Sequence, residues 1–291
     1  MIFKRIKTKK HNKIGIICLN NPENLNIIES DTFQEINFLL DLFENDKNIK
    51  IILIKAICGM SKTGKKVFSA GVNLKEYDKK FELAEKNPAE FKNSLKKNRQ
   101  LMTKIEKFKK PVFIGIDGII CGGFLELALA CDLILASEKA LFKLNEVNIG
   151  LIPGYGGISR LLKIVGKNKT FEIVATGKEI FPKEALDLGI VAEIFNDSEF
   201  EEKILNYCEN LAEKSANSLY LIKKTIYQLL RHCEPGTGEA IHKSSNIKWI
   251  ASSQAPRNDE LQTIEKIEVE NFLKAIQSED SREGIKAFLD K

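Results

Sequence analysis

The stretch GIICGGFLELALACDLILA (residues 118–136) is a glycine-led apolar run that is long enough to cross a membrane. Glu126 lies in its middle, and Asp132 follows in its second half. Acids near the centre of a membrane span are costly to insert, and the chain has no second run of this kind. We therefore expect this run to be buried in protein, and its lone central carboxylate requires a chemical explanation.

Strands and helices alternate on both sides of this run. IKIILIKAI (49–57) is a near-continuous β-branched segment, which is typical of a strand covered on both faces. Further strands are expected at 14–19, 111–117 and 132–137, with helices after residue 30, over 88–108 and from about Gly122. This alternation predicts an α/β fold with mostly parallel strands.

The second half of the chain is predicted to be mainly helical. A polar break at 232–260 interrupts it, which indicates a long loop or insertion before a helical tail over 261–290. We expect two regions: a core over 1–195 that carries the site, and a helical region over 196–291.

Composition excludes several classes of protein. With 43% hydrophobic and 29% charged residues, the chain is typical of a soluble globular protein, and its net charge of +5 comes without a nucleic-acid-binding motif. Its six cysteines form no CxxC pair, which favours reduced thiols in the cytoplasm and argues against a structural zinc site. No secretory signal is predicted, so the expected location is cytoplasmic.

One stretch nearly matches a phosphate-binding loop. GMSKTGKK (59–66) follows a predicted strand, but Lys66 stands where a hydroxyl would bind magnesium. The next residues, VFSAG, do not begin a helix whose N-terminus could bind phosphate. Nucleotide hydrolysis is therefore disfavoured.

Two glycine turns supply backbone donors of the kind that acyl chemistry requires. FSAGVNLKE (68–76) leaves an N–H free at Val72, and CGGFLE (121–126) leads through Gly122 and Gly123 into a helix. Both turns can direct amides at one oxygen. Two such donors form an oxyanion hole, which would stabilise the enolate that develops on a thioester carbonyl.

Two carboxylates accompany these turns, Glu126 and Glu146, the latter within LNEVNIGLIPGYGG (144–157). Adding water across a double bond next to a carbonyl needs one group that takes a proton from water and one that delivers a proton to the α-carbon. One carboxylate can suffice for moving a proton within a substrate, so isomerisation stays open. The apolar neighbours of Glu126 predict burial and a raised pKa.

Six segments in this order resemble the crotonase (enoyl-CoA hydratase/isomerase) superfamily over nearly the whole chain. They are LNNPENLNII, FSAGVNLKE, PVFIGIDGIICGGFLELALACD, FKLNEVNIGLIPGYGGISRL, ATGKEIFPKEALDLGIV and SEDSREGIKAFLDK. The resemblance implies a spiral of repeated ββα units with a C-terminal helical region that forms trimers, commonly paired into hexamers. It also implies an acyl-CoA thioester as ligand, with no metal, redox cofactor or membrane involved.

The resemblance also assigns roles, position by position. It implies that Val72 and Gly123 supply the oxyanion-hole amides and that Glu126 and Glu146 are catalytic. It also implies that the carbonyls of Ile27 and Ala70 receive the adenine amino group and that Lys75 lies near CoA. In the tail, Phe288 and Lys291 are expected to reach a neighbouring subunit's ligand. The leading interpretation is a hydratase that adds water to a 2-enoyl-CoA. Alternatives are an enoyl-CoA isomerase, a hydratase or hydrolase of a cyclic acyl-CoA, and, in another class, a non-catalytic binder of acyl-CoA or RNA.

The chain departs from the pattern of the superfamily at several places. Phe124 stands where a third small residue is usual, so we expect it either to crowd the start of the helix or to shape the acyl pocket. Asn145 replaces a proline before the second glutamate, which is expected to loosen that turn. The 77–98 segment varies with acyl chain in the superfamily and is too polar to indicate a substrate.

Overall fold

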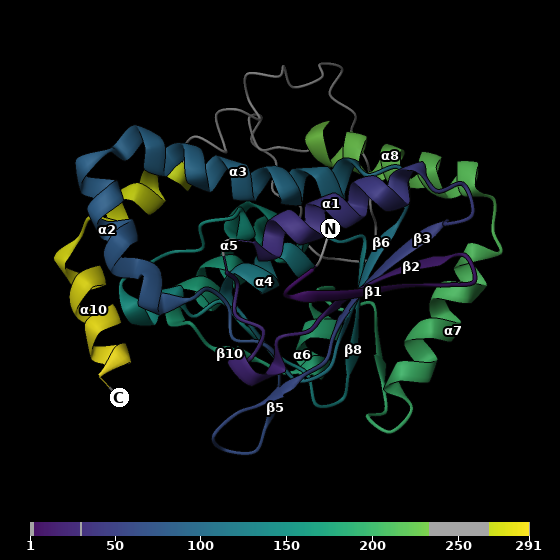
Figure 1. Cartoon of the computed structure of the whole chain (residues 1–291), viewed down its shortest axis with the longest axis horizontal. Coiled ribbons are helices and arrows are strands. Elements are labelled where there is room, and N and C mark those ends of the chain that lie inside the picture. Colours follow the sequence, from purple (N-terminus) through teal and green to yellow (C-terminus); the bar gives the residue numbers. More distant parts are fainter. Residues whose placement is uncertain (1–2, 30, 233–267, 291) are drawn as a thin grey trace.

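The computed structural model describes residues 3–29, 31–232 and 268–290 (Figure 1). Its strands form two sheets. The first has six strands in the order β1(Ile6–His11), β2(Ile14–Leu19), β3(Ile51–Ala56), β6(Val112–Ile116), β8(Leu133–Ser137) and β11(Glu193–Phe195). The second has five, in the order β10(Glu179–Ile180), β9(Leu141–Lys143), β7(Ile119–Cys121), β5(Lys66–Ser69) and β4(Gly59–Met60). Pairing is parallel except at β1, β4 and β10, each of which closes a sheet edge.

The chain winds between these sheets as a spiral. Three times a strand of the first sheet is followed by one of the second, as β3 then β5, β6 then β7, and β8 then β9. Helices follow each pair: α2(Tyr77–Lys86) with α3(Pro88–Lys107), then α4(Gly122–Ala128), then α5(Gly157–Thr176). This confirms the predicted α/β spiral of ββα units. The 118–136 run becomes β7, α4 and β8, and no helix in the described ranges is long and apolar enough to cross a membrane.

Alternation along β3 explains why this strand is apolar except for Lys55 near its end. Ile52 and Ile54 face the main core beneath α1(Thr32–Asn45), whereas Ile51 and Leu53 face a second core against α7(Phe200–Ala212). A strand covered on both faces has no solvent side to carry polar residues, so the prediction for 49–57 is confirmed. The predicted helix after residue 30 is α1, with Asp31 at its N-cap position but no side-chain capping bond; Ser30 lies outside the described residues.

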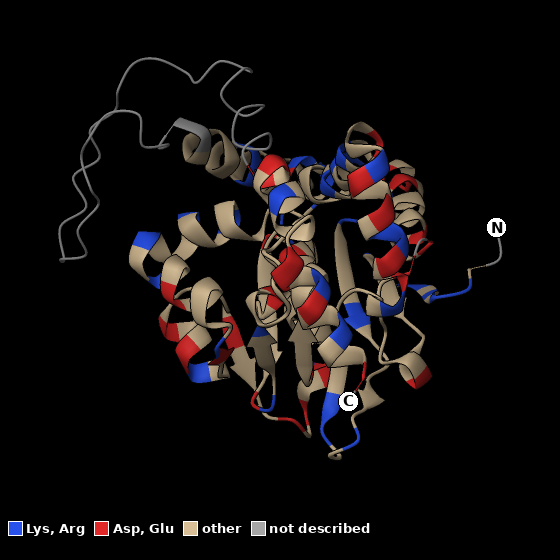
Figure 2. Ribbon diagram, turned by 90° about the vertical axis from the view of Figure 1, so that its left-hand side faces the viewer, with Lys and Arg blue, Asp and Glu red and all other residues tan. Residues whose placement is uncertain are grey.

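Charged residues are spread over the elements. Lys7, Lys9 and Lys10 are exposed on the edge strand β1, where charged side chains discourage pairing with another chain. Figure 2 shows acidic and basic residues interspersed along the helices in the view drawn. Lys66, which replaces the hydroxyl residue of the phosphate-binding motif, begins strand β5 and not a helix.

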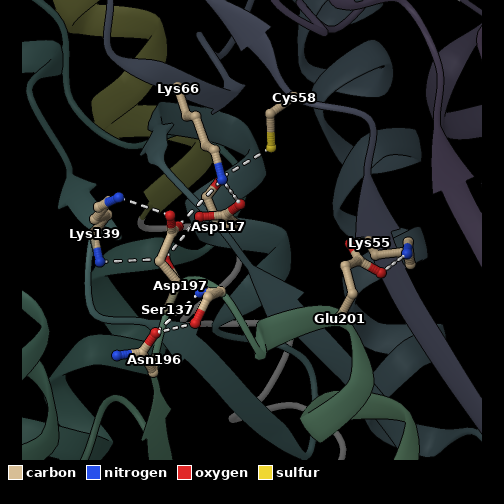
Figure 3. A network of polar contacts seen from close by, with 10 residues as sticks. Lys55, Cys58, Lys66, Asp117, Ser137, Lys139, Asn196, Asp197 and Glu201 are labelled. Carbon is tan, nitrogen blue, oxygen red and sulfur yellow. Dashed lines mark hydrogen bonds and ion pairs between the residues drawn. The ribbon is translucent and has the colours of Figure 1, made fainter.

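Lys66 belongs to a polar network where strands of the first sheet end and strands of the second sheet begin (Figure 3). Its Nζ bonds Asp117 Oδ2 at 2.7 Å and Asp197 Oδ1 at 3.2 Å. Ser137 Oγ donates to Asp117 Oδ1 at 2.8 Å, and Lys139 Nζ bonds Asp197 Oδ2 at 2.7 Å. Because these residues come from β5, the β6–β7 turn, β8 and the loop after β11, the network joins the two sheets.

Helices complete the C-terminal region. After α6(Pro182–Asp187) and α7 comes α8(Ala216–His232), and residues 268–276 form a helix that precedes α10(Glu279–Leu289). Figure 1 shows α10 beside α2, at the far side of the molecule from α7. The predicted insertion at 232–260 lies almost wholly outside the described residues, and the proposed boundary between two regions at 195 stays a prediction.

Candidate active site

Helix α4 carries Glu126 into the interior of the molecule. Its residues from Gly123 to Ala128 are all buried, and Glu126 is 2% exposed. The helix therefore has no polar face, as its composition predicted. Phe124 is fully buried, with its ring edge-on to Phe33 and Phe68 at centroid distances of 5.9 and 6.4 Å. Phe124 thus packs in the core around α4, and the helix begins at Gly122 despite the larger side chain.

The Glu126 carboxylate is held by the backbone of the glycine loop 154–157. Gly154 N donates to Oε1 at 3.2 Å, while Tyr155 N and Gly157 N each donate to Oε2 at 2.7 Å. Three amides that converge on one carboxylate form an anion-binding nest. Two glycines of the IPGYGG stretch (152–157), Gly154 and Gly157, therefore contact Glu126 directly.

Burial decides the proton affinity of Glu126. Desolvation raises its pKa to about 7, against the opposing effect of the amides of Gly157 and Tyr155. The charge of Glu268 raises it further, and that of Arg160 lowers it. The raised pKa that the apolar neighbours predicted is therefore borne out in direction, for the reason given by the sequence.

Glu146 is the second carboxylate of the site and begins the short 3-10 helix η3(Glu146–Ile149). Its Oε2 is buried without a hydrogen-bond partner in the described chain. Burial and then the charge of Glu126 raise the pKa of Glu146 to about 8. The tertiary structure thus brings the two predicted glutamates into one electrostatically coupled pair.

The turn before Glu146 forms without a proline. Asn145 has φ −109°, which lies outside the range that a proline ring allows, and its carbonyl accepts the N–H of Asn148 at 3.1 Å. The turn therefore has a conformation that proline would not allow, and its expected loosening stays a prediction.

The two glycine turns meet at the start of α4. A Cβ on Gly71 would lie 3.1 Å from the carbonyl oxygen of Cys121, and one on Gly122 would lie 3.3 Å from Glu146 Oε1 and 4.0 Å from Gly71 Cα. Both glycines have positive φ, of +86° and +53°. The contact requires glycine at both positions, because a side chain would separate the turns or displace Glu146.

Both predicted oxyanion donors lie at this junction. Val72 forms a parallel bridge with Ile28, in which Ile28 N bonds Gly71 O at 2.7 Å and Asn73 N bonds Ile28 O at 3.4 Å. This pairing uses the groups on either side of the Val72 N–H. Gly123 lies in the first turn of α4, where backbone N–H groups have no partner within the helix.

The predicted CoA-binding carbonyls lie on neighbouring turns. Ala70 N donates to Leu25 O at 2.9 Å, which joins the turn that contains Ile27 to the end of β5. Ala70 is exposed and Ile27 is half-buried, while Lys75 is exposed on η2(Leu74–Glu76). Sequence reasoning missed Asn26, which is the buried centre of this junction.

Asn26 explains how two distant segments meet. Its Nδ2 donates to Ile57 O at 2.9 Å and to Phe68 O at 2.8 Å, and its Oδ1 accepts Asn21 N at 2.8 Å. Its φ of +47° is one that asparagine tolerates better than most residues. The signal in the sequence was the asparagine-rich NNPENLN stretch, in which no single position stood out.

The predicted tail residues, Phe288 and Lys291, lie at or beyond the end of α10. Phe288 is 56% exposed near the end of α10, and Lys291 lies outside the described residues. Helix α10 itself packs on η3 of the same chain, because a Cβ on Gly284 would lie 2.8 Å from the Ile149 backbone. The contact of Phe288 and Lys291 with a neighbouring subunit's ligand stays a prediction.

The spiral of ββα units is the fold of the crotonase superfamily. The chain belongs to the enoyl-CoA hydratase/isomerase family, whose model matches residues 9–242.

Individual relatives agree with this membership. A probable enoyl-CoA hydratase of Bacillus subtilis (strain 168) is 32% identical over 279 residues, which cover 96% of this chain and 93% of the relative. The crystal structure of an enoyl-CoA hydratase from Bacillus halodurans superposes with a TM-score of 0.77 at 20% identity, covers 98% of this chain and 100% of its own, and supports the fold. The crystal structure of a methylmalonyl-CoA decarboxylase complexed with 2S-carboxypropyl-CoA superposes with a TM-score of 0.73 at 25% identity. The match covers 100% of this chain and 97% of the decarboxylase chain. The chain is an enzyme of the crotonase family.

Proposed function

We propose that this protein is an enoyl-CoA hydratase, which catalyses the reversible syn addition of water to a 2-enoyl-CoA thioester. The observation that carries the proposal is that Glu126, held by three backbone amides in the interior, and the half-buried Glu146 lie close enough for the charge of Glu126 to raise the pKa of Glu146. Hydration needs one acid and one base at the same time, and two neighbouring carboxyl groups with raised pKa values can share one proton. The B. subtilis relative, named a probable enoyl-CoA hydratase, supports the same reaction.

The backbone supplies the electrophilic assistance. We assign the N–H groups of Val72 and Gly123 to the thioester oxygen, where they stabilise the negative charge of the enolate. Gly123 adds the positive end of α4 to this effect. The assignment rests on the contact between the Gly71 and Gly122 turns, which holds both amides at one junction.

The environments of the two glutamates suggest how they divide the work. Three amides favour the ionised form of Glu126, so we assign to it the removal of a proton from water. Glu146 has a buried oxygen without a partner and the higher pKa, so we assign to it the proton delivered to C2. The water hydroxyl bonds to C3, the C2–C3 π electrons take the proton from Glu146, and the proton from water stays on Glu126 until the pair re-equilibrates.

The remaining parts of the proposal follow the family. We assign the carbonyls of Ile27 and Ala70 to the adenine amino group, Lys75 to the neighbourhood of CoA, and Phe288 with Lys291 to a neighbouring subunit's ligand. We also propose a homotrimer or homohexamer, and a cytoplasmic location. Addition of water transfers no electrons to an external acceptor, so the reaction needs no redox cofactor, and we propose that it uses no metal.

The test follows the conjugated-thioester absorbance of crotonyl-CoA on mixing with the purified protein and with Glu126→Gln and Glu146→Gln. We expect rapid loss of absorbance with the unmodified protein and a fall in kcat of at least about 100-fold in either variant, which is the usual scale of general acid–base catalysis. Glu138→Gln, which changes an exposed glutamate, serves as the control and is expected to keep full activity.

No loss of absorbance with the unmodified protein would contradict the hydratase proposal. A gain of absorbance from a 3-enoyl-CoA would then identify an isomerase, the alternative that needs only one base. Binding of acyl-CoA without turnover of either substrate would identify a non-catalytic binder. RNA binding with a steep salt dependence would favour the other class of function, which the interspersed charges of Figure 2 do not favour.

A further inference from the structure

The first turn of α5 faces two carboxylates, and only one of them belongs to the proposed catalytic pair. Gly157 N, at the start of the helix, donates to Glu126 Oε2 at 2.7 Å. Two residues later Ser159 N donates to Oε1 of Glu268 at 2.9 Å, and Ser159 Oγ lies 3.3 Å from Glu268 Oε2. Glu268 lies in the helix over residues 268–276, so a residue near the C-terminus caps the helix that binds the catalytic candidate.

Glu268 is itself neutralised by an arginine. Arg99 Nη2, from α3, bonds Glu268 Oε2 at 2.5 Å, and both side chains are almost fully buried. Within the described residues Arg99 Nη1 has no hydrogen-bond partner, so Glu268 carries the neutralisation of this buried cation. Removing either partner would leave the other as an uncompensated charge in the interior.

The loop between the two carboxylates is tightly packed. Its N–H groups point to Glu126, whereas Tyr155 O accepts Arg160 Nη1 at 2.9 Å on the opposite side. Arg160 is in turn held by Glu106 through Nε at 2.8 Å. A Cβ on Gly156 would lie 2.4 Å from Arg160 Nη1 and 3.4 Å from Arg99 Nη2, so both guanidinium groups lie against this loop.

We propose that Glu268 and Arg99 set the charge at the helix end that binds Glu126: Glu268 occupies the first turn of α5 beside the catalytic carboxylate, and Arg99 balances its negative charge. This inference rests on the proposed function. It makes the C-terminal helical region contribute to the active site of its own chain, because Glu268 reaches the first turn of α5 from the helix over residues 268–276.

Glu268 acts on Glu126 through its charge. The charge of Glu268 shares a buried helix end with Glu126 and raises its pKa, after the larger effects of burial and of the two amides. Charged and titratable groups reach this region from every element packed around it. They are Glu146 of η3, Tyr155 and Arg160 at the start of α5, Tyr77 of α2, Arg99 and Glu106 of α3, and Glu268. Changing Arg99 or Glu268 leaves the others in place.

The test compares Glu268→Gln, Arg99→Gln and the double variant. Glu268→Gln removes a negative charge and frees a positive one, so the Glu126 pKa is expected to fall by about one unit, the lower end of the effect of a nearby charge. Arg99→Gln leaves the negative charge uncompensated, so the pKa is expected to rise. The double variant is expected to lie between the two. A merely structural role would instead make the losses add and would give no opposite shifts.

Two readouts are used. The first is the pH profile of kcat for crotonyl-CoA hydration. The second is infrared difference spectroscopy of the protonated carboxyl C=O stretch against pH, with the Glu126 band identified by its loss in Glu126→Gln, and this readout needs no turnover. Glu270→Gln is the matched control, because it removes the same charge from the same helix at a partly exposed residue that pairs with Lys92; no shift is expected.

The outcomes separate this inference from the proposed function. Opposite infrared shifts in a protein that does not hydrate crotonyl-CoA would support the inference and overturn the hydratase. Active protein whose Glu126 band shifts in the same direction in both variants, or in neither, would overturn the inference alone. If Glu268→Gln does not fold by circular dichroism, Arg99→Gln decides by the direction of its shift, and Glu268→Asp, which keeps the charge, must leave the pKa of Glu126 unchanged.

Discussion

At the scale of single residues, the charged form of Glu146 is unfavourable in the candidate site. Glu146 has a buried oxygen without a partner in the described chain, and desolvation together with the nearby Glu126 raises its pKa to about 8. Glutamate in an unfolded chain has a pKa of about 4.3. The folded state therefore binds this proton more tightly than the unfolded state does, and the site favours folding only while Glu146 is protonated.

The sign of the pH dependence follows from this difference. The stability that protonated Glu146 contributes is fully present below the unfolded pKa of about 4.3 and is lost as the pH rises through the folded pKa of about 8. We expect Glu146→Gln to raise the Tm at pH 9 by at least about 2–4 °C, the scale of about 1 kcal/mol for a chain of this size, and to raise it less at pH 5. Calorimetry at both pH values measures this. An equal change at both, or one matched by the exposed control Glu138→Gln, would contradict the account.

At the scale of elements, the position of Glu146 depends on α10. A Cβ on Gly150, which ends η3, would lie 2.5 Å from Ser281 N, and one on Gly284 would lie 2.8 Å from the Ile149 backbone. Two glycines thus allow the backbones of α10 and η3 to touch. Helix α10 begins where the Ser278 side chain accepts the N–H of Ser281 at 3.2 Å, so the contact is made by a capped helix end.

We expect Gly284→Ala to push α10 away from η3, because backbone atoms cannot give way as a flexible side chain can. The predicted result is a fall in kcat of about 10-fold or more for crotonyl-CoA hydration, since a displacement of about 1 Å in catalytic groups can reduce rates about 100-fold. Glu283→Ala, at the neighbouring exposed position, is the control. Steady-state kinetics and circular dichroism of both variants test this, and unchanged kcat in Gly284→Ala would refute it.

At the scale of the whole molecule, a buried ion pair joins the C-terminal helices to the sheet core. Lys223 of α8 is 6% exposed and donates to Asp132 Oδ2 at 2.7 Å and to Ile105 O at 2.8 Å. Asp132 also accepts Val112 N, at the start of β6, at 2.7 Å. The acid at the end of the 118–136 run therefore connects α8, α3 and the first sheet.

We expect Asp132→Ala to lower the free energy of unfolding by about 3–5 kcal/mol, because it leaves the ammonium of Lys223 buried without an opposite charge. Urea unfolding monitored by circular dichroism provides the measurement. Asp41→Ala, which removes the exposed partner of Lys104, is the control and should cost less than about 1 kcal/mol. Similar losses in the two variants would show that the pair does not anchor α8.

The fold and part of the site could be predicted from local patterns. The apolar strand at 49–57 and the alternation of strands with helices were sufficient to predict an α/β fold with mostly parallel strands, because burial on both faces has local sequence requirements. The spiral of ββα units was implied by the resemblance of six segments to a superfamily. The burial and raised pKa of Glu126 followed from its helical neighbours alone. The packing of Phe124 could not be predicted from the sequence, because it depends on Phe33 and Phe68, which lie on other elements. Its expected role in shaping the acyl pocket stays a prediction.

The sequence by itself determined the α/β class through its local patterns, and the order of six segments carried the resemblance to the family and indicated the two glutamates as candidates. Only the tertiary structure decided what surrounds Glu126: the amides of the 154–157 loop, and behind them Glu268 and Arg99. These partners come from segments far apart in the chain, and no local pattern relates them. The proton affinity of a buried carboxylate depends on every charge and dipole within a few ångströms, and those distances exist only after the chain has folded.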